Sequence, residues 1–346
     1  MPPILTTTSD ISNRTKGYFV RELLKRAQPL LVFNKLGTPR PLPKHVGKTI
    51  TFRGYLPLPT TPKTLIEGVT PDASKPTYRE VEAIINQYGD HIRITDVLPD
   101  VHEDPLIAEF SDILSEQAAI MLERVTLGVL NAGTNVVFSG ETGGVIAAGR
   151  NEVNKPLTLN LQRLVTRTLK RQEARYLRQV ISSSPNFNTS PIEAAYIAVT
   201  HTDLEATIRD LPGFVPTVKY GQRQPMDGEI GSVEDVRYVL TNIPEPWVDA
   251  GAPPLAGDSM ESTSGACCDV YPIYYIAKDA YNVIPFARAK GGTPPIDLMV
   301  LQPNVARGGD PLGQRGSIGW KAMHTAAITY DFYMVRAEVA VPRLRG

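Results

Sequence analysis

Cysteine is almost absent from this chain, which excludes a fold held together by a disulfide framework. The 346 residues include two cysteines, Cys267 and Cys268, and these are neighbours. A disulfide between adjacent residues is strained, and the sequence offers neither thiol another partner. We expect two buried thiols, with a redox or metal-binding role as the less favoured alternative.

The chain also lacks an excess of charge of either sign and any long apolar run. Lysine plus arginine and aspartate plus glutamate number 36 each, so the formal net charge is zero. A protein that coats nucleic acid through charge alone would be basic, so this balance argues against that class. No apolar run approaches the roughly 18 residues of a membrane helix, and the first residues lack a signal-peptide core. We therefore expect no membrane association.

Motifs that carry chemistry are missing as well. No two of the five histidines stand at the four-residue spacing of a helical zinc site. The glycine-rich stretch 140–144 lacks the Gly-Lys-Ser/Thr ending of a phosphate loop, and no Gly-x-Ser-x-Gly elbow occurs. His201 and Asp203 follow a strand-like run without a nucleophile nearby, so we interpret them as turn and cap residues. The sequence predicts no enzyme, and no catalytic residue, cofactor or metal site.

One acidic run has residue types that metals bind. It comprises Asp96, Asp100, His102, Glu103 and Asp104. The run also directly precedes the longest helical signal of the chain, where carboxylates favour the positive end of a helix. We favour this electrostatic interpretation, and a metal site stays open as the alternative.

What the sequence does have is a long polar excursion between two extended stretches. Apolar and polar residues alternate over 47–55 and again over 88–95, which predicts two strands. The connection from Pro57 to Pro76 is unusually long for a loop inside a compact domain, which indicates a functional role. A two-stranded arm that cannot bury itself needs another molecule to lie on.

Three segments have helical periodicity. Residues 14–33 are typical of an amphipathic helix, and over 105–131 apolar residues recur at three- and four-residue steps. Asp104 is the expected N-cap of this second helix, because Pro105 would occupy its first turn. A third helix is expected over about 157–181.

The third helix carries a stripe of cations. They recur at three- or four-residue steps or lie beside that row: Arg163, Arg167, Lys170, Arg171, Arg175 and Arg178. A solvated face, or one that forms salt bridges to a neighbouring subunit, is one interpretation. A surface that faces DNA is the other, since clustered cations attract phosphates.

From residue 194 the pattern changes to short strands separated by turns rich in Gly, Pro, Asp and Ser. Strands are expected at 195–200, 236–240, 271–277, 282–286 and 298–301, a short helix at 203–211, and one long alternating strand at 326–341. A chain of this length exceeds the usual size of a single core, so we expect two compact units with extensions.

Four sequence marks span nearly the whole chain. They are Tyr18 to Pro29; Gly47-Lys48-Thr49 leading into Phe52-Arg53; Glu67-Gly68-Val69-Thr70-Pro71 followed by Gln87-Tyr88-Gly89; and Gly313 to Lys321. In their order and spacing they resemble the major capsid proteins of tailed bacteriophages. The resemblance is to the coliphage N-four-type family within the Hong Kong 97-like fold.

This resemblance implies an α+β fold with five parts. An N-terminal arm would cover 1–46 and an extended two-stranded E-loop 47–97. A peripheral domain would cover 98–190 with its spine helix at 105–131, and an axial domain with a mixed sheet 191–310. The C-terminal strand region 311–346 would return to the core. The E-loop residues expected to contact an adjacent subunit are Glu67, Gly68, Val69, Thr70 and Pro71.

The function implied by the resemblance is a shell. The chain would self-assemble as pentamers and hexamers into the icosahedral head of a tailed phage, and would enclose double-stranded DNA without sequence-specific binding. Portal, scaffolding and decoration proteins would be its partners. Assembly would occur in the host cytoplasm, and the protein would end in the virion. Two alternatives stay open: an encapsulin-like nanocompartment shell, and a soluble mixed α/β enzyme, against which the missing motifs count.

Overall fold

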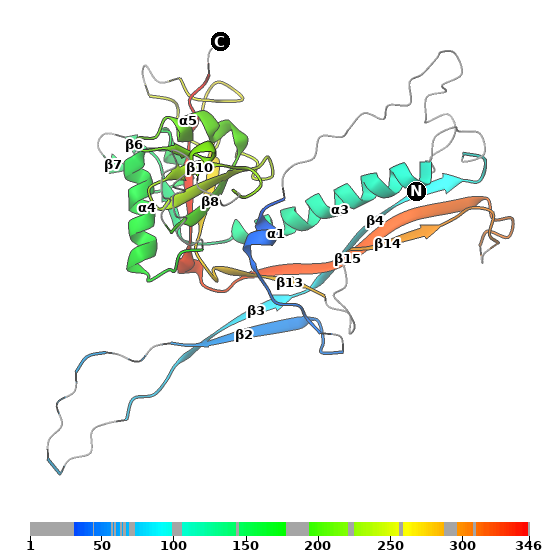
Figure 1. Cartoon of the computed structure of the whole chain (residues 1–346), viewed down its shortest axis with the longest axis horizontal. Helices are drawn as coiled ribbons and strands as arrows, with labels where there is room; N and C mark the ends of the chain where they lie inside the picture. Colours follow the sequence, from blue (N-terminus) through cyan, green and yellow to red (C-terminus); the bar gives the residue numbers. More distant parts are fainter. Residues whose placement is uncertain are drawn as a thin grey trace.

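A computed structural model shows an elongated molecule with three parts: a compact unit, a long sheet backed by a helix, and a two-stranded arm (Figure 1). The structure describes residues 31–43, 45–56, 58, 60–62, 64, 67–68, 73–98, 106–142, 145–177, 194–220, 225–255, 259–286, 296–306 and 309–344. The expected helix at 14–33 lies almost wholly outside these residues.

The long sheet is organised around strand β15 (Arg315–Ile328). On one side β15 pairs antiparallel with the whole of β4 (Asn86–Thr95). On its other side β15 pairs with β14 (Ile296–Leu301) and then with β13 (Tyr281–Pro285). The short β1 (Thr38–Pro39) extends the sheet beside β13. Burial alternates along most of β15, as expected for a strand with one covered face.

Helix α3 (Leu106–Leu130) covers that face (Figure 1). The side chains that join helix and sheet form one buried cluster of Leu114, Ala118, Leu122, Ile318, Trp320 and Ala322. The indole of Trp320 also donates a hydrogen bond to Gln117 Oε1 at 3.1 Å. The observed bounds agree with the helix expected at 105–131, whose proposed N-cap, Asp104, lies outside the described residues.

The arm consists of β2 (Thr49–Tyr55) and β3 (Tyr78–Ile84), an antiparallel pair that joins no other strand of the described chain (Figure 1). The return strand of the arm is therefore 78–84, and our assignment of 88–95 to that position is wrong. The stretch 88–95 belongs to β4 in the long sheet. Both stretches alternate, so periodicity alone could not show which of them pairs with β2.

The compact unit contains a seven-stranded mixed sheet. Its strands, in spatial order, are β5 (Val136–Phe138), β16 (Met334–Val339), β12 (Tyr271–Ile276), β8 (Tyr196–Thr200), β11 (Val236–Leu240), β10 (Glu229–Val233) and β9 (Val215–Pro216). The four strands from β16 to β11 are buried at every position. Burial on both faces explains why these strands are mostly continuous apolar runs.

Helices cover both faces of this sheet. Helices α4 (Leu159–Arg171) and α5 (Glu205–Arg209) pack on one face. The C-terminal end of α3 and the short α1 (Phe33–Leu36) pack on the other. The remaining elements are the hairpin β6 (Glu141–Thr142) and β7 (Val145–Ile146) and the 3₁₀ turns η1 (Arg150–Glu152), η2 (Thr202–Leu204), η3 (Thr217–Lys219) and η4 (Asp331–Tyr333).

Helix α4 is shorter than the helix expected at 157–181. Thr158 caps its start by accepting a hydrogen bond from Leu161 N at 3.2 Å. At its end Glu173 adopts a φ of 57°, and Ala174 N donates to Leu169 O at 3.1 Å. This is the Schellman arrangement that closes many helices, usually with glycine at the left-handed position. Because glutamate occupies that position here, the end of the helix at this point could not be predicted from the residue types.

The last part of the chain is divided between the two sheets. We expected one strand at 326–341, but β15 ends at Ile328, η4 turns the chain, and β16 then enters the compact sheet. Strands β13 and β14, which fall in the unit expected at 191–310, pair with β15 in the long sheet. The expected strand at 326–341 and the expected unit at 191–310 each contribute to both sheets, so the sequence pattern alone could not assign either of them to one unit.

A network of polar groups lies where α1, α3 and β15 meet, with Glu123, Thr126 and His324 buried and Asn34 half-buried. Asn34 N donates to Glu123 Oε2 at 2.8 Å, and Asn34 Oδ1 accepts from Thr126 Oγ1 at 2.6 Å. His324 Nε2 lies 3.0 Å from the same Thr126 hydroxyl. The Thr126 hydroxyl has one proton, which it donates to Asn34 Oδ1. In the bond between His324 and this hydroxyl, His324 is therefore the donor, with its proton on Nε2.

Burial shifts the pKa values of Glu123 and His324, the two residues at the ends of this network. It raises the pKa of the Glu123 carboxyl from 4.5 to about 7, because the backbone N–H groups around Asn34 offset only part of the desolvation. Glu123 Oε1 is buried without a hydrogen-bond partner in the described residues. Burial also lowers the pKa of His324 to about 4, so the ring is neutral at pH 7.

We predict that Glu123→Gln becomes increasingly stabilising, relative to the original chain, as pH rises from about 4.5 to about 7. The folded pKa of Glu123 lies above its unfolded value, so its contribution falls as pH rises from about 4.5 to about 7. At pH 8 the ionised carboxylate costs on the order of 1–3 kcal/mol, which glutamine avoids. Urea unfolding of both proteins from pH 5 to 8 measures this.

Subtraction of the two stability profiles makes the test specific. The pKa of His324 is lowered on folding, so the contribution of His324 to the stability of the protein falls as pH falls from 6.5 towards 4. This loss is the same in the original chain and in the variant. The difference between the profiles therefore isolates Glu123. A difference that stays constant with pH would contradict the prediction.

Candidate functional site

The arm exposes apolar and aromatic side chains that the described part of the chain does not cover. Tyr55 is 71% exposed and Tyr78 57%, and their rings meet edge to face with centroids 6.5 Å apart. Arg53 lies over the Tyr78 ring, 4.9 Å from its centroid, and pairs with Glu80 on the opposite strand. Leu56 is also exposed. Aromatic and arginine side chains of this kind are enriched in protein–protein interfaces.

A groove of about 490 Å³ lies at the root of the arm. The inner strand residues Phe52 and Val81 line one part of it, and Tyr330 and Phe332 of the turn after β15 line another. Apolar and cationic groups thus meet in one hollow, because Arg79 also lines it. This composition suits a polypeptide segment better than a small polar substrate.

At the far end of the arm the structure describes Glu67 and Gly68 of the five expected contact residues. Gly68 has a φ of 80°, which a side chain would strain, and the space around it is open in the described chain. The residues Val69, Thr70 and Pro71 lie outside the described part.

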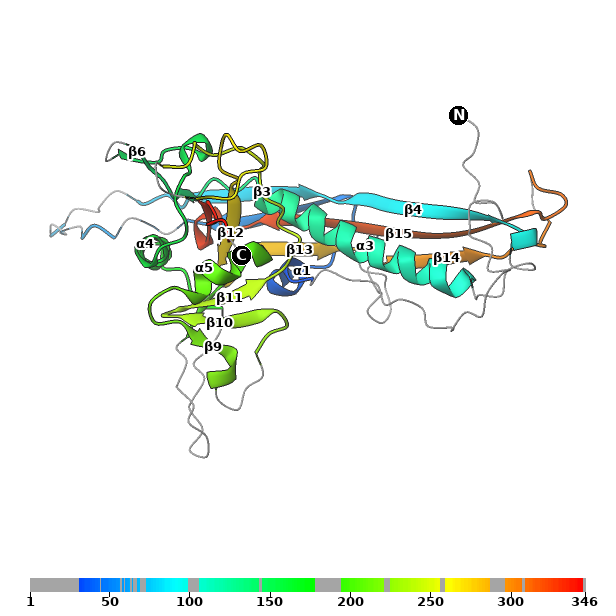
Figure 2. The same cartoon turned by 90° about the horizontal axis from the view of Figure 1, so that it is seen from above.

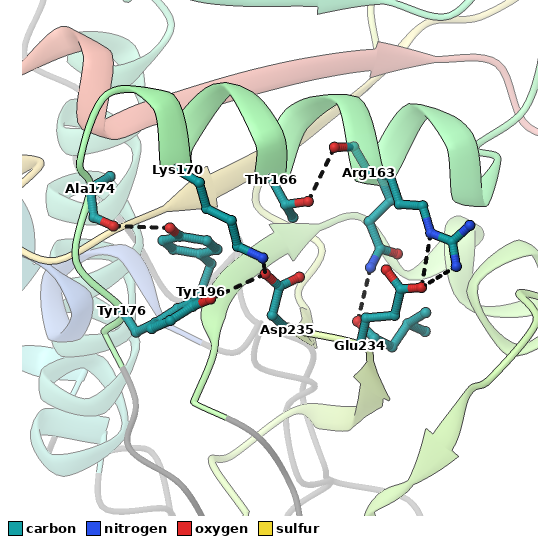
Figure 3. A network of polar contacts seen from close by, with 10 residues as sticks. Arg163, Thr166, Lys170, Ala174, Tyr176, Tyr196, Glu234 and Asp235 are labelled. Carbon is teal, nitrogen blue, oxygen red and sulfur yellow. Dashed lines mark hydrogen bonds and ion pairs between the residues drawn. The ribbon is translucent and has the colours of Figure 1, made fainter.

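Two cations of α4, Arg163 and Lys170, extend to the turn between β10 and β11 (Figure 3). Arg163 forms an ion pair with Glu234, which has a φ of 50° in that turn. Lys170 pairs with the adjacent Asp235 at 2.5 Å. The arginine lowers the pKa of the Glu234 carboxyl by hydrogen bonding, and the Asp235 carboxylate raises the pKa of Lys170 in the same way.

Arg167 and Arg171 of the same helix are exposed and line a groove of about 670 Å³ with the two ion pairs. Neither guanidinium has an ion-pair partner among the described residues. Arg175 is exposed but follows the end of α4, and Arg178 lies outside the described residues. The structure therefore brings four of the six predicted cations together. The two acidic partners could not be predicted from the sequence, because they lie far along the chain in a turn without glycine or proline.

The histidine and cysteine sites have structural roles in the described chain. His201 Nδ1 accepts a hydrogen bond from Asp203 N at 3.3 Å, and Asp203 Oδ2 accepts from the Tyr271 hydroxyl at 3.0 Å. Cys268 is buried, which raises its pKa to about 11, and Cys267 is half-buried. Within the described residues, no three His, Cys, Asp or Glu side chains cluster in a way that could hold a metal ion.

No helix among the described residues is long and apolar enough to cross a membrane. Of the acidic run before α3, Asp96 accepts a hydrogen bond from Val97 N at 3.0 Å, and the residues from Asp100 to Asp104 lie outside the described part.

Solved structures that share this architecture include phage capsids. The capsid of Ralstonia phage GP4 matches with a TM-score of 0.66 at 12% identity, and 99% of each chain is covered. The capsid of cyanophage P-SCSP1u matches with a TM-score of 0.59 at 12% identity over 97% of each chain. The acid-stable capsid of Helicobacter pylori bacteriophage KHP30 matches with a TM-score of 0.59 at 10% identity over 97% of this chain and 98% of the other. At such identities the likeness shows the fold alone.

No curated protein sequence matches the chain. A family description of phage capsid proteins does match, and it covers residues 79–337. This range includes strands of both sheets, all of α3 and all of α4. Its members are structural proteins and not enzymes, in agreement with the missing catalytic motifs. The chain belongs to the phage capsid protein family.

Proposed function

We propose that this chain is the major capsid protein of a tailed phage and that it self-assembles into the icosahedral head around double-stranded DNA. The observation that carries the proposal is the arm of β2 and β3, whose aromatic and apolar side chains nothing in the described chain covers. A two-stranded ribbon is marginally stable in water and becomes stable when a further surface packs on it. Other copies of the chain would provide that surface.

The parts of the molecule fit the Hong Kong 97-like arrangement of the N-four type. The arm corresponds to the E-loop, α3 to the spine helix of a peripheral domain, and the seven-stranded sheet to the axial domain. Pentamers and hexamers would form around the axial domains. The remaining partners would be portal, scaffolding and decoration proteins, with assembly in the host cytoplasm and the finished shell in the virion.

The burial that assembly offers is large enough to order such an arm. Permanent protein interfaces bury about 2,000 Å² or more. At roughly 25 cal/mol per Å² of apolar area, burial on that scale contributes tens of kcal/mol before ordering and association costs are subtracted. A shell therefore gains much of its stability between subunits, and its isolated subunit is expected to be less ordered.

Expression of the full chain tests the proposal directly. We expect closed particles by negative-stain electron microscopy and a fast-sedimenting species in ultracentrifugation. In virions we expect the particle to contain DNA. A protein cargo in place of DNA would indicate a nanocompartment shell, and a chain that stays a compact monomer at all concentrations would refute the shell.

We predict that Gly68→Val reduces the yield of closed particles by roughly tenfold while the subunit stays soluble. Valine at a φ of 80° is strained, by on the order of 1–2 kcal/mol, and would distort the tip of the arm where it meets a neighbour. The matched control is Gly265→Val, since Gly265 has a φ of 83° and equally open surroundings in the compact unit. Normal particle yield with Gly68→Val would refute the docking of the tip.

The proposed role of the α4 face has its own test, the double variant Arg167→Gln/Arg171→Gln. Both side chains are exposed, so the stability of the subunit should change by less than about 0.5 kcal/mol. Normal particle yield with weaker DNA retention at raised salt would indicate a face towards DNA. Loss of particles would indicate a subunit interface. If neither property changes, both roles are wrong.

A further inference from the structure

Val218 is an apolar side chain that stands out of the compact unit. It is 92% exposed, the largest fraction among the large apolar side chains that the structure describes. Val218 lies in η3, directly after β9, the outermost strand of the seven-stranded sheet. The next residue, Lys219, is exposed and has no ion-pair partner in the described chain. An isolated exposed valine needs no explanation, but this one has a cation beside it on a short rigid turn.

The turn that carries Val218 is firmly held. Tyr220, which follows it, is buried, and its hydroxyl donates to Glu229 Oε1 of β10 at 2.8 Å. Tyr220 N also donates to Thr217 O at 3.0 Å, which closes the 3₁₀ turn. The protruding side chain is therefore presented by an ordered support, so that binding it costs little conformational entropy.

The compact unit also has an apolar hollow of a size that such a side chain could enter. It measures about 580 Å³ and lies between the start of α4, helix α5 and the C-terminal residues. Its walls include Ala206, Leu211, Pro212, Pro342 and Leu344. Leu344 is 75% exposed, so the hollow is open on that side. Figure 1 shows α5 and the C-terminus at one end of the compact unit, and Figure 2 shows β9 at its margin.

The hollow carries charge of the sign opposite to that of Lys219. Asp203 and Asp210 line it, and both are exposed. Asp203 is engaged by the Tyr271 hydroxyl, whereas Asp210 has no ion-pair partner in the described chain. The chain thus carries an apolar side chain next to a cation and, elsewhere, an apolar hollow with a carboxylate at its rim, two surfaces of complementary character.

We infer that Val218 and Lys219 of one copy dock into this hollow of the next copy, with Lys219 against Asp210. The two surfaces are different parts of one chain, so the contact is head-to-tail, and repetition by rotation closes a ring. The inference deepens the proposed shell function and rests on it, because it names the contact by which compact units join around an axis. Insertion of Val218 into the hollow would supply affinity. The charge pair between Lys219 and Asp210 would fix the relative position of the two copies.

Exchange of the charges provides the first test. We expect Lys219→Glu and Asp210→Lys each to raise the protein concentration needed for assembly by roughly three- to tenfold, since each removes one charge pair and creates a repulsion. The double variant Lys219→Glu/Asp210→Lys should return to within about twofold of the original chain. Light scattering against concentration measures all four proteins. A double variant as defective as the two changes combined would overturn the inference.

The apolar contact is tested by Val218→Asp, with Val248→Asp as its control. Val248 is also an exposed valine of the compact unit but lines neither surface. We expect Val218→Asp to raise the assembly concentration about tenfold and Val248→Asp to leave it unchanged. Both substitutions are at exposed positions, and thermal unfolding of the subunits should confirm equal stability. Equal assembly by both variants would contradict the contact.

Crosslinking identifies the contact even if assembly stops at small oligomers. Val218→Cys/Leu344→Cys, in a Cys267→Ser background, should form intermolecular disulfides in a ladder that ends at a closed ring, and neither single cysteine variant should. If closed particles form without this ladder, the inferred contact is wrong and the shell function stands. A chain that never oligomerises would overturn both.

Discussion

Strand β15 is the element on which the rest of the structure depends. Paired along both edges, it holds β4, β14 and β13 in one sheet, and the long helix α3 packs on one face of that sheet. None of these strands would be stable as an isolated pair, because a two-stranded ribbon buries too little apolar surface. The same strand leads through η4 into β16, the second strand of the compact sheet, between β5 and β12. One continuous stretch of chain therefore connects the two sheets.

The glycines of β15 explain why its sequence is so distinctive. A side chain on Gly319 would place a carbon 2.8 Å from His91 Cβ, and one on Gly316 would come within 2.8 Å of Pro303. Both positions need glycine because the neighbouring strand or turn approaches too closely for any other residue. Close strand packing thus requires two of the glycines in the stretch from Gly313 to Lys321.

Where the sheets join, the structure uses polar groups that are costly to bury. The hydrogen-bond network from Glu123 through Asn34 and Thr126 to His324 fixes α1 and β15 against α3 at one point. Buried hydrogen-bonded groups specify a single geometry, since any displacement leaves a donor or acceptor without a partner. The orientation of the two sheets is therefore set by directional bonds as well as by apolar packing.

The sequence was sufficient to predict those helices and strands whose type is determined by the residue pattern within the element itself. Strands β8, β11 and β12 were recognisable as apolar runs, and α3 as a long stripe at helical spacing. It was insufficient where the answer depended on contacts between distant segments. The partner of β2 is β3 and not β4, and this is decided by the pairing of β4 with β15 more than 200 residues away. The ion pairs of α4 with Glu234 and Asp235 were invisible for the same reason.

In a shell, the balance of positive and negative charge in the chain limits the repulsion between neighbouring copies. A protein that places many copies edge to edge cannot carry a large net charge, because the repulsion would grow with every copy added. The formal charge of zero avoids that cost, yet the charges are not spread evenly. Cations gather on α4, Lys219 stands beside Val218, and the carboxylates of Asp203 and Asp210 flank α5. Local excess within global neutrality allows identical subunits to attract one another in one orientation, whereas uniform neutrality would leave their orientation unspecified.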